Sequence, residues 1–150
     1  MSANCPNQAT ARDTLATLLQ TKLMGPPQLV DDVKPSRWKL EGKTVVMVDD
    51  NGVERLDATL DADTNDAIFH FLIFVFVPFG EDQAGWDETD ATNLRALIEK
   101  YITDCLIDNV ETDDWHYIAH EGKSTADTII EGGIIYKYAE IPIAATNFTR

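Results

Sequence analysis

One run of eleven residues constrains the fold more than any other part of the chain. Residues Ala67–Val77 contain a single polar side chain, His70, and are rich in aromatic and β-branched types, which predicts a β-strand. The run is too short to cross a bilayer as a helix, which takes about 20 apolar residues. Side chains alternate across a strand, and here both faces would be apolar. Such a strand lies inside a sheet that is covered on both faces, by its own chain or by another subunit.

The rest of the chain supplies two helices and several more strands. Ala9–Met24 and Ala91–Leu106 carry apolar residues at spacings of three and four, which predicts two amphipathic helices. Strands come in runs joined by tight turns, so we expect an α+β fold with a mostly antiparallel sheet, a long central strand and two packed helices. Besides the central strand, the expected strands are Gln28–Val33, Lys43–Val48, Val53–Leu60, Trp115–Ala119, Ala126–Glu131 and Ile134–Ile143.

Turn residues and prolines set the expected strand ends. Asp49–Gly52 contains Asn-Gly, which accepts the positive φ values of a tight hairpin turn, and Gly132-Gly133 predicts a second hairpin. Pro78 should end the central strand, and Pro142 suggests a strand end at a sheet edge. The 150 residues fit one domain. We expect a flexible N-terminal arm over residues 1–8 and a single α+β domain over residues 9–150.

The charge of the chain narrows the classes of partner. Twelve Lys and Arg stand against 26 Asp and Glu, for a net charge of −14. Such a surface repels phosphate, which disfavours direct binding to nucleic acid or to an anionic membrane. The simplest interpretation of the acidity is solubility. The functional alternatives are a basic protein partner, cation binding, or a surface that DNA passes without sticking. We see no secretory signal and no transmembrane run, and Cys105 is expected to be a buried thiol on a helix.

No motif predicts an enzyme or a cofactor. The chain lacks a phosphate-binding glycine loop and a G-x-S-x-G elbow. His116 and His120 have a zinc-like spacing, but on a predicted strand they lie about 13 Å apart, too far for one metal ion. His70, alone in an apolar strand, is expected to be a hydrogen-bonded core or interface residue. Loose binding of a divalent ion by the acidic loops 61–66 and 81–90 stays open, although no metal ligand is assigned.

A few aromatic, basic and acidic residues are candidates for contacts with partners. Arg37, Trp38 and Lys39 form the one basic-aromatic cluster, which suits an acidic neighbour. Core packing is the competing interpretation for each tryptophan, whereas exposed aromatics with a polar surround suit an interface. The candidate interface residues are Arg37, Trp38, Lys39, Trp86, Trp115 and His116, and the candidate acidic loop residues at a rim or lumen are Asp61, Asp63, Asp66, Glu81 and Asp82.

Taken together, the order of elements resembles the tail terminator (tail completion) proteins of long-tailed bacteriophages. The resemblance covers roughly residues 9–145 and rests on layout. The segments that carry it are a leading helix, a Pro-interrupted segment, a long strand, the helix after it and a closing strand. These are Ala9–Met24, Val33–Trp38, Phe69–Val77, Ala91–Leu106 and Gly132–Ile143.

The resemblance implies a structural virion protein without catalytic residues. In that family a small α+β subunit forms a hexameric ring that caps the tail tube, ends tail elongation and joins the tail to the head connector. The implied partners are further copies of the chain, the tail tube protein and a connector or neck protein, and DNA passes through the ring without specific binding. The implied location is the neck of the virion, after assembly in the host cytoplasm. The alternatives are another neck or tail-tube-associated protein, an acidic inhibitor that mimics DNA, and a metal-assisted hydrolase.

Overall fold

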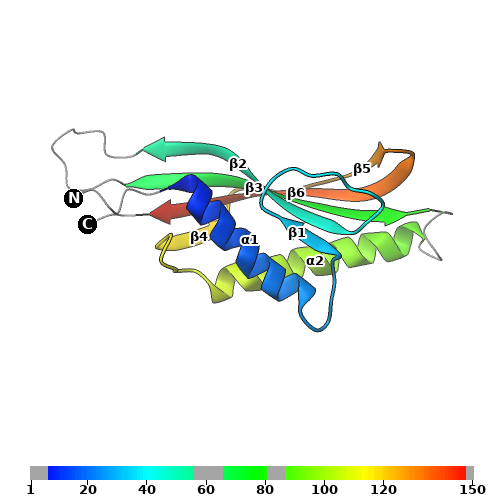
Figure 1. Cartoon of the computed structure of the whole chain (residues 1–150), viewed down its shortest axis with the longest axis horizontal. Helices are drawn as coiled ribbons and strands as arrows, with labels where there is room; N and C mark the ends of the chain where they lie inside the picture. Colours follow the sequence, from blue (N-terminus) through cyan, green and yellow to red (C-terminus); the bar gives the residue numbers. More distant parts are fainter. Residues whose placement is uncertain (1–6, 56–65, 81–86, 148–150) are drawn as a thin grey trace.

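A computed structural model describes residues 7–55, 66–80 and 87–147 of the chain. Within these residues two helices and six strands follow one another along the chain, and the long strands run along the long axis of the molecule (Figure 1). The helices are α1 (Gln8–Met24) and α2 (Glu88–Asp108), and the strands are β1 (Asp32–Lys34), β2 (Val45–Arg55), β3 (Ala67–Phe79), β4 (Tyr117–His120), β5 (Thr125–Glu131) and β6 (Ile134–Asn147).

The strands form a single mixed sheet in the order β1-β2-β3-β6-β4, and β5 also pairs with β6. The short β1 is parallel to β2, and every other pairing is antiparallel. The apolar strand β3 lies between β2 and β6 and pairs with β6 over its whole length. The predicted α+β class, with a mostly antiparallel sheet and a long central strand, is therefore confirmed.

Both helices cover the same face of the sheet. Phe69, Phe71 and Ile73 of β3 are fully buried in one core cluster with apolar residues of α1 and α2. Figure 1 shows α2 running along the sheet and α1 crossing in front of it. Each helix begins at a side chain that accepts backbone N–H groups of the first turn, Asn7 for α1 and Asp87 for α2.

The expected hairpin turn at Asp49–Gly52 is wrong. The chain continues through it as one strand, β2, and both halves of β2 pair with β3. The register shifts between Asp50 and Val53, and Gly52 has a φ of +100°. Asn-Gly thus accommodates the extra residue of a β-bulge instead of a turn, because the long β3 offers partners to both halves of β2.

Two prolines lie inside strands that they were expected to end. Pro78 pairs with Tyr136 of β6, at a position where β2 no longer lies alongside β3, so this part of β3 behaves as an edge. Pro142 lies within β6, between the residues paired with β5 and those paired with β4. The missing N–H group of Pro142 falls at this gap, where its carbonyl accepts a hydrogen bond from Glu121.

Candidate functional site

The face of the sheet that the helices leave open carries a hollow lined by aromatic side chains. Phe74 and Phe76 of β3 point to this face and form a second core cluster with neighbours from β2 and β6. No helix among the described residues covers this cluster; the segment of residues 35–44, between β1 and β2, lies over it in part and contributes Leu40. The hollow has a volume of about 570 Å³, and its lining includes Arg37, Trp38, Leu40, Met47, Phe74, Phe76, Ile129 and Tyr138.

Specific contacts hold the covering segment in place. The backbone N–H of Gly42 donates to the hydroxyl of Tyr136 over 2.8 Å, at a turn where Glu41 and Gly42 both have positive φ. Arg37 donates from Nε to the Asp49 carboxylate over 2.9 Å, and its guanidinium lies 4.5 Å from the centre of the Phe74 ring. Such cation–π contacts add to packing when the ring is partly shielded from water. The segment is thus a fixed wall of the hollow.

The structure brings two of the predicted interface residues together at this hollow. Arg37 and Trp38 line it, and the exposed Lys39 follows them. The Trp38 side chain is 62% exposed, although the ammonium of Lys34 lies 5.1 Å from its ring centre. A large aromatic group held at the surface beside an apolar hollow is typical of a contact site for another protein.

Trp115 corrects the sequence interpretation. It is 1% exposed and packs in the main core, where its indole N–H donates to the carbonyl of Asn109 over 2.9 Å. A buried indole cannot contact a partner, so core packing is the correct interpretation for this residue. His116, next to it, is exposed before β4, far along the sheet from the hollow.

Among the acidic candidates for a ring rim or lumen, only Asp66 lies within the described residues. Asp66 is half-buried and directly precedes β3. The remaining candidates, Asp61, Asp63, Glu81, Asp82 and Trp86, lie outside the described residues.

His70 lies on the open face between two carboxylates. Its Nδ1 is 2.5 Å from Oε2 of Glu121, and its Nε2 is 2.6 Å from Oε1 of Glu54. Burial lowers the pKa of His70, but the hydrogen bonds to Glu121 and Glu54 and their negative charges outweigh it and raise the pKa above the usual 6.5. The protonated ring donates to both carboxylates and so ties β2 and the end of β4 to β3. The expectation of a hydrogen-bonded histidine is confirmed.

No sequence pattern predicts this arrangement of His70 between Glu54 and Glu121, which we call the histidine clamp. Glu54 and Glu121 are separated from His70 by 16 and 51 residues, and only the sheet register brings them together. The two ring nitrogens face different carboxylates, so the three side chains do not converge on one point. In the part of the chain that the structure describes, no group of three His, Cys, Asp or Glu is placed to hold a metal ion.

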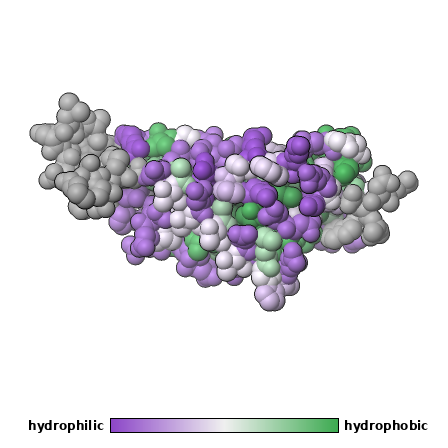
Figure 2. Space-filling model, in the orientation of Figure 1, coloured by the Kyte–Doolittle hydropathy of each residue, from purple (hydrophilic) through white to green (hydrophobic). Residues whose placement is uncertain are grey.

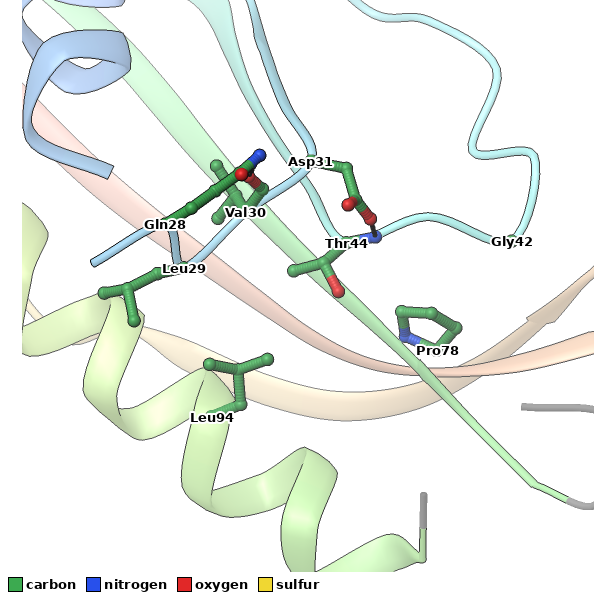
Figure 3. A pocket seen from close by; sticks show the side chains of 8 residues that line it. All are labelled: Gln28, Leu29, Val30, Asp31, Gly42, Thr44, Pro78 and Leu94. Carbon is green, nitrogen blue, oxygen red and sulfur yellow. Dashed lines mark hydrogen bonds between the residues drawn. The ribbon is translucent and has the colours of Figure 1, made fainter. Parts of the chain in front are cut away.

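A second cavity of about 420 Å³ lies beside α2 and offers little chemistry. Figure 3 shows Leu94 of α2 and Pro78 of β3 on one side and the segment from Gln28 to Asp31 on the other. The Asp31 carboxylate accepts the N–H of Thr44 over 2.9 Å, and the Gln28 amide donates to the carbonyl of Val30. The Asp31 carboxylate is therefore engaged within the chain, and the described residues that line the cavity lack the convergent polar groups that a ligand site needs.

Tyr138 lines the hollow, and Tyr136 is buried in the core cluster beneath it. Burial is the largest cause that raises the pKa of each phenol above its usual 10. Tyr138 also donates to the Glu140 carboxylate over 2.6 Å. Both hydroxyls therefore stay protonated and act as hydrogen-bonding groups, Tyr136 toward Gly42 and Tyr138 toward Glu140.

Comparison with known proteins adds no relative. None of the protein-family models matches the chain, and a search of curated proteins finds no match. None of the described helices is long and apolar enough to cross a membrane.

Proposed function

We propose that this chain is a structural protein of a bacteriophage tail that assembles into a ring, in the manner of the tail terminator proteins.

 The observation that carries the proposal is a sheet with one face closed by both helices and the other left with an aromatic hollow beside the exposed Trp38. A subunit with such an open face gains stability by association.

The arrangement of elements supports the same proposal. The leading helix α1, the long strand β3 followed directly by α2, and the closing hairpin of β5 and β6 follow the order that the resemblance rests on. We infer a hexameric ring that caps the tail tube, ends tail elongation and joins the tail to the connector or a neck protein in the virion. DNA would pass through the ring, and the net charge of −14 keeps it from sticking. No catalytic residue and no cofactor are part of this proposal.

An acidic inhibitor that mimics DNA is the second candidate, because several carboxylates share the open face. Most of these carboxylates are engaged within the chain. Asp49 accepts from Arg37, Glu140 accepts from Tyr138, and Glu54 and Glu121 flank His70. Carboxylates held in this way are poorly placed to imitate a row of phosphates, which favours the ring.

Tail assembly provides the experiment. The purified chain is added to growing tail tubes from the phage that encodes it, and tube lengths and tube ends are examined by electron microscopy. The proposal expects tubes that stop growing and carry a ring at one end. Tubes that elongate at the same rate with bare ends would contradict it, and inhibition of a DNA-binding enzyme by the monomer would then favour the acidic inhibitor.

A further inference from the structure

Two surface patches of opposite charge, each with an exposed apolar centre, lie on opposite sides of the sheet. The first is the basic ledge, which we define as Arg37, Trp38 and Lys39. Residues 33–43 around it carry four basic residues and one acidic residue, in a chain whose net charge is −14. Lys39 is exposed and forms no ion pair with any residue that the structure describes. The ledge therefore offers a free positive charge next to an exposed indole.

The second patch is the acidic corner at the end of α2, which we define as Ile107, Asp108, Val110, Glu111 and Asp113. The side chains of Ile107 and Val110 are 64% and 37% exposed, an unusual position for branched apolar groups so close together in the chain. Asp108, Glu111 and Asp113 beside them are all exposed. One of the small hydrophobic areas on the largely hydrophilic face in Figure 2 lies over this end of α2.

The last turn of α2 does not itself supply the positive charge that a helix C-terminus favours. The last turn of α2 contains no basic residue, whereas Asp108 lies in it and adds negative charge at the negative end of the helix dipole. Lys22 of α1 forms an ion pair with Asp108 over 3.7 Å and offsets part of this negative charge. A cation from outside the chain would stabilise this end of α2.

The two patches cannot meet within one chain. The segment that carries the basic ledge packs on the open face with Phe74, whereas α2 packs on the opposite face with Phe71 and Ile73. Contact between two different patches of identical chains is heterologous, and a closed series of such contacts makes a ring. A two-fold dimer would need both patches on one shared surface to make both contacts, and here they lie on opposite sides of the sheet.

We propose that the basic ledge of one copy docks on the acidic corner of the next copy, with Trp38 against Ile107 and Val110 and with Lys39 facing Glu111. This inference rests on the proposed ring function and names the contact that builds the ring. The occupant of the ledge is a second copy because the same chain presents an exposed apolar patch of opposite charge. The contact joins apolar burial to charge complementarity, which together give affinity and a fixed orientation.

A charge swap tests the contact. Self-association of the purified full chain is measured by sedimentation, alone and on tail tubes, for the wild type, K39E, E111K and the double variant K39E/E111K. We expect each single variant to associate at least about tenfold more weakly and the double variant to recover most of the loss. K123E makes the same charge change at an exposed lysine outside both patches and should associate as the wild type does. Thermal unfolding of each variant confirms that the exposed substitutions leave the fold intact.

The other outcomes separate this contact from the ring itself. If K39E and E111K each associate as strongly as the wild type, the contact is overturned but the ring proposal stands. The same holds if each single variant associates more weakly and the double variant does not recover the association. A K39E chain that self-associates normally but no longer binds tubes would show that the ledge receives the tube protein instead. A wild type that stays monomeric with and without tubes would overturn both proposals.

Discussion

At the scale of residues, buried or half-buried polar side chains act as ties between elements that are distant in the chain. The Tyr136 hydroxyl accepts from Gly42 and fixes the segment that covers the open face, and His70 joins Glu54 of β2 to Glu121 after β4. Neither tie could be predicted, because a single sequence shows which groups can hydrogen-bond but not which strands become neighbours. The helix stripe of Leu15, Leu19 and Leu23 was predictable, because its spacing of four is local.

Removing the Tyr136 hydroxyl should loosen the covering segment. In Y136F the Gly42 N–H loses its 2.8 Å partner while the ring stays in place. We expect a loss of about 0.5–1.5 kcal/mol in the free energy of unfolding. Hydrogen exchange at the amides of residues 40–44 should become faster, and Y138F, which removes a hydroxyl that donates to Glu140, is the matched control for that region. Unchanged exchange would show that other contacts hold the segment.

The histidine clamp predicts a pH dependence of stability. Because the pKa of His70 is raised in the folded chain, the folded state binds the proton more tightly than the unfolded state does. This stabilisation is complete below the unfolded pKa of about 6.5 and is lost as the pH rises through the higher folded pKa. The stability advantage of the wild type over H70Q should therefore shrink as the pH rises from about 6.5 through the higher pKa of His70 in the folded chain. An advantage that stays constant or grows over this range would contradict the clamp, as would a His70 titration midpoint below 6.5 in NMR spectra.

At the scale of elements, the sequence predicted which segments are helices and strands better than where they stop. The central strand, both helices and the hairpin of β5 and β6 were expected near their observed positions. The hairpin at Asp49–Gly52 was not, because Asn-Gly suits a bulge and a turn equally well and the choice depends on the length of the partner strand. The burial of Trp115 could not be predicted for a related reason. A tryptophan beside a strand end packs into the core or faces solvent according to which elements pack around it, and this depends on the fold.

The bulge in β2 gives a prediction at this scale. Gly52 has a φ of +100°, and a Cβ added there would meet no atom within 4 Å, so the cost of G52A comes from the backbone alone. We expect G52A to lower the free energy of unfolding by about 1–2 kcal/mol, measured by urea denaturation. The neighbouring exposed residue provides the control, and N51A should change the stability by less than about 0.5 kcal/mol. A neutral G52A would mean that the bulge relaxes without a positive φ.

At the scale of the whole molecule, the chain is an acidic subunit with one closed and one open sheet face. Many of its basic side chains form ion pairs with acidic side chains of the same chain. These are Arg12, Lys22, Lys34, Arg37, Arg95 and Lys137. The surface left to a partner is therefore mostly acidic, and the free Lys39 at the basic ledge stands out against it. Composition predicted the acidity, but the location of the ledge beside the hollow required the fold, because it depends on where the segment of residues 35–44 crosses the sheet.

The molar mass of the purified chain in solution tests the central claim most directly. Static light scattering over a range of protein concentrations, repeated with tail tubes present, reports how many copies assemble. The ring account predicts a species of about six times the 16.7 kDa of one chain, either in solution or bound at tube ends. A mass that stays at one chain at every concentration, with no protein recovered on tubes, would contradict it.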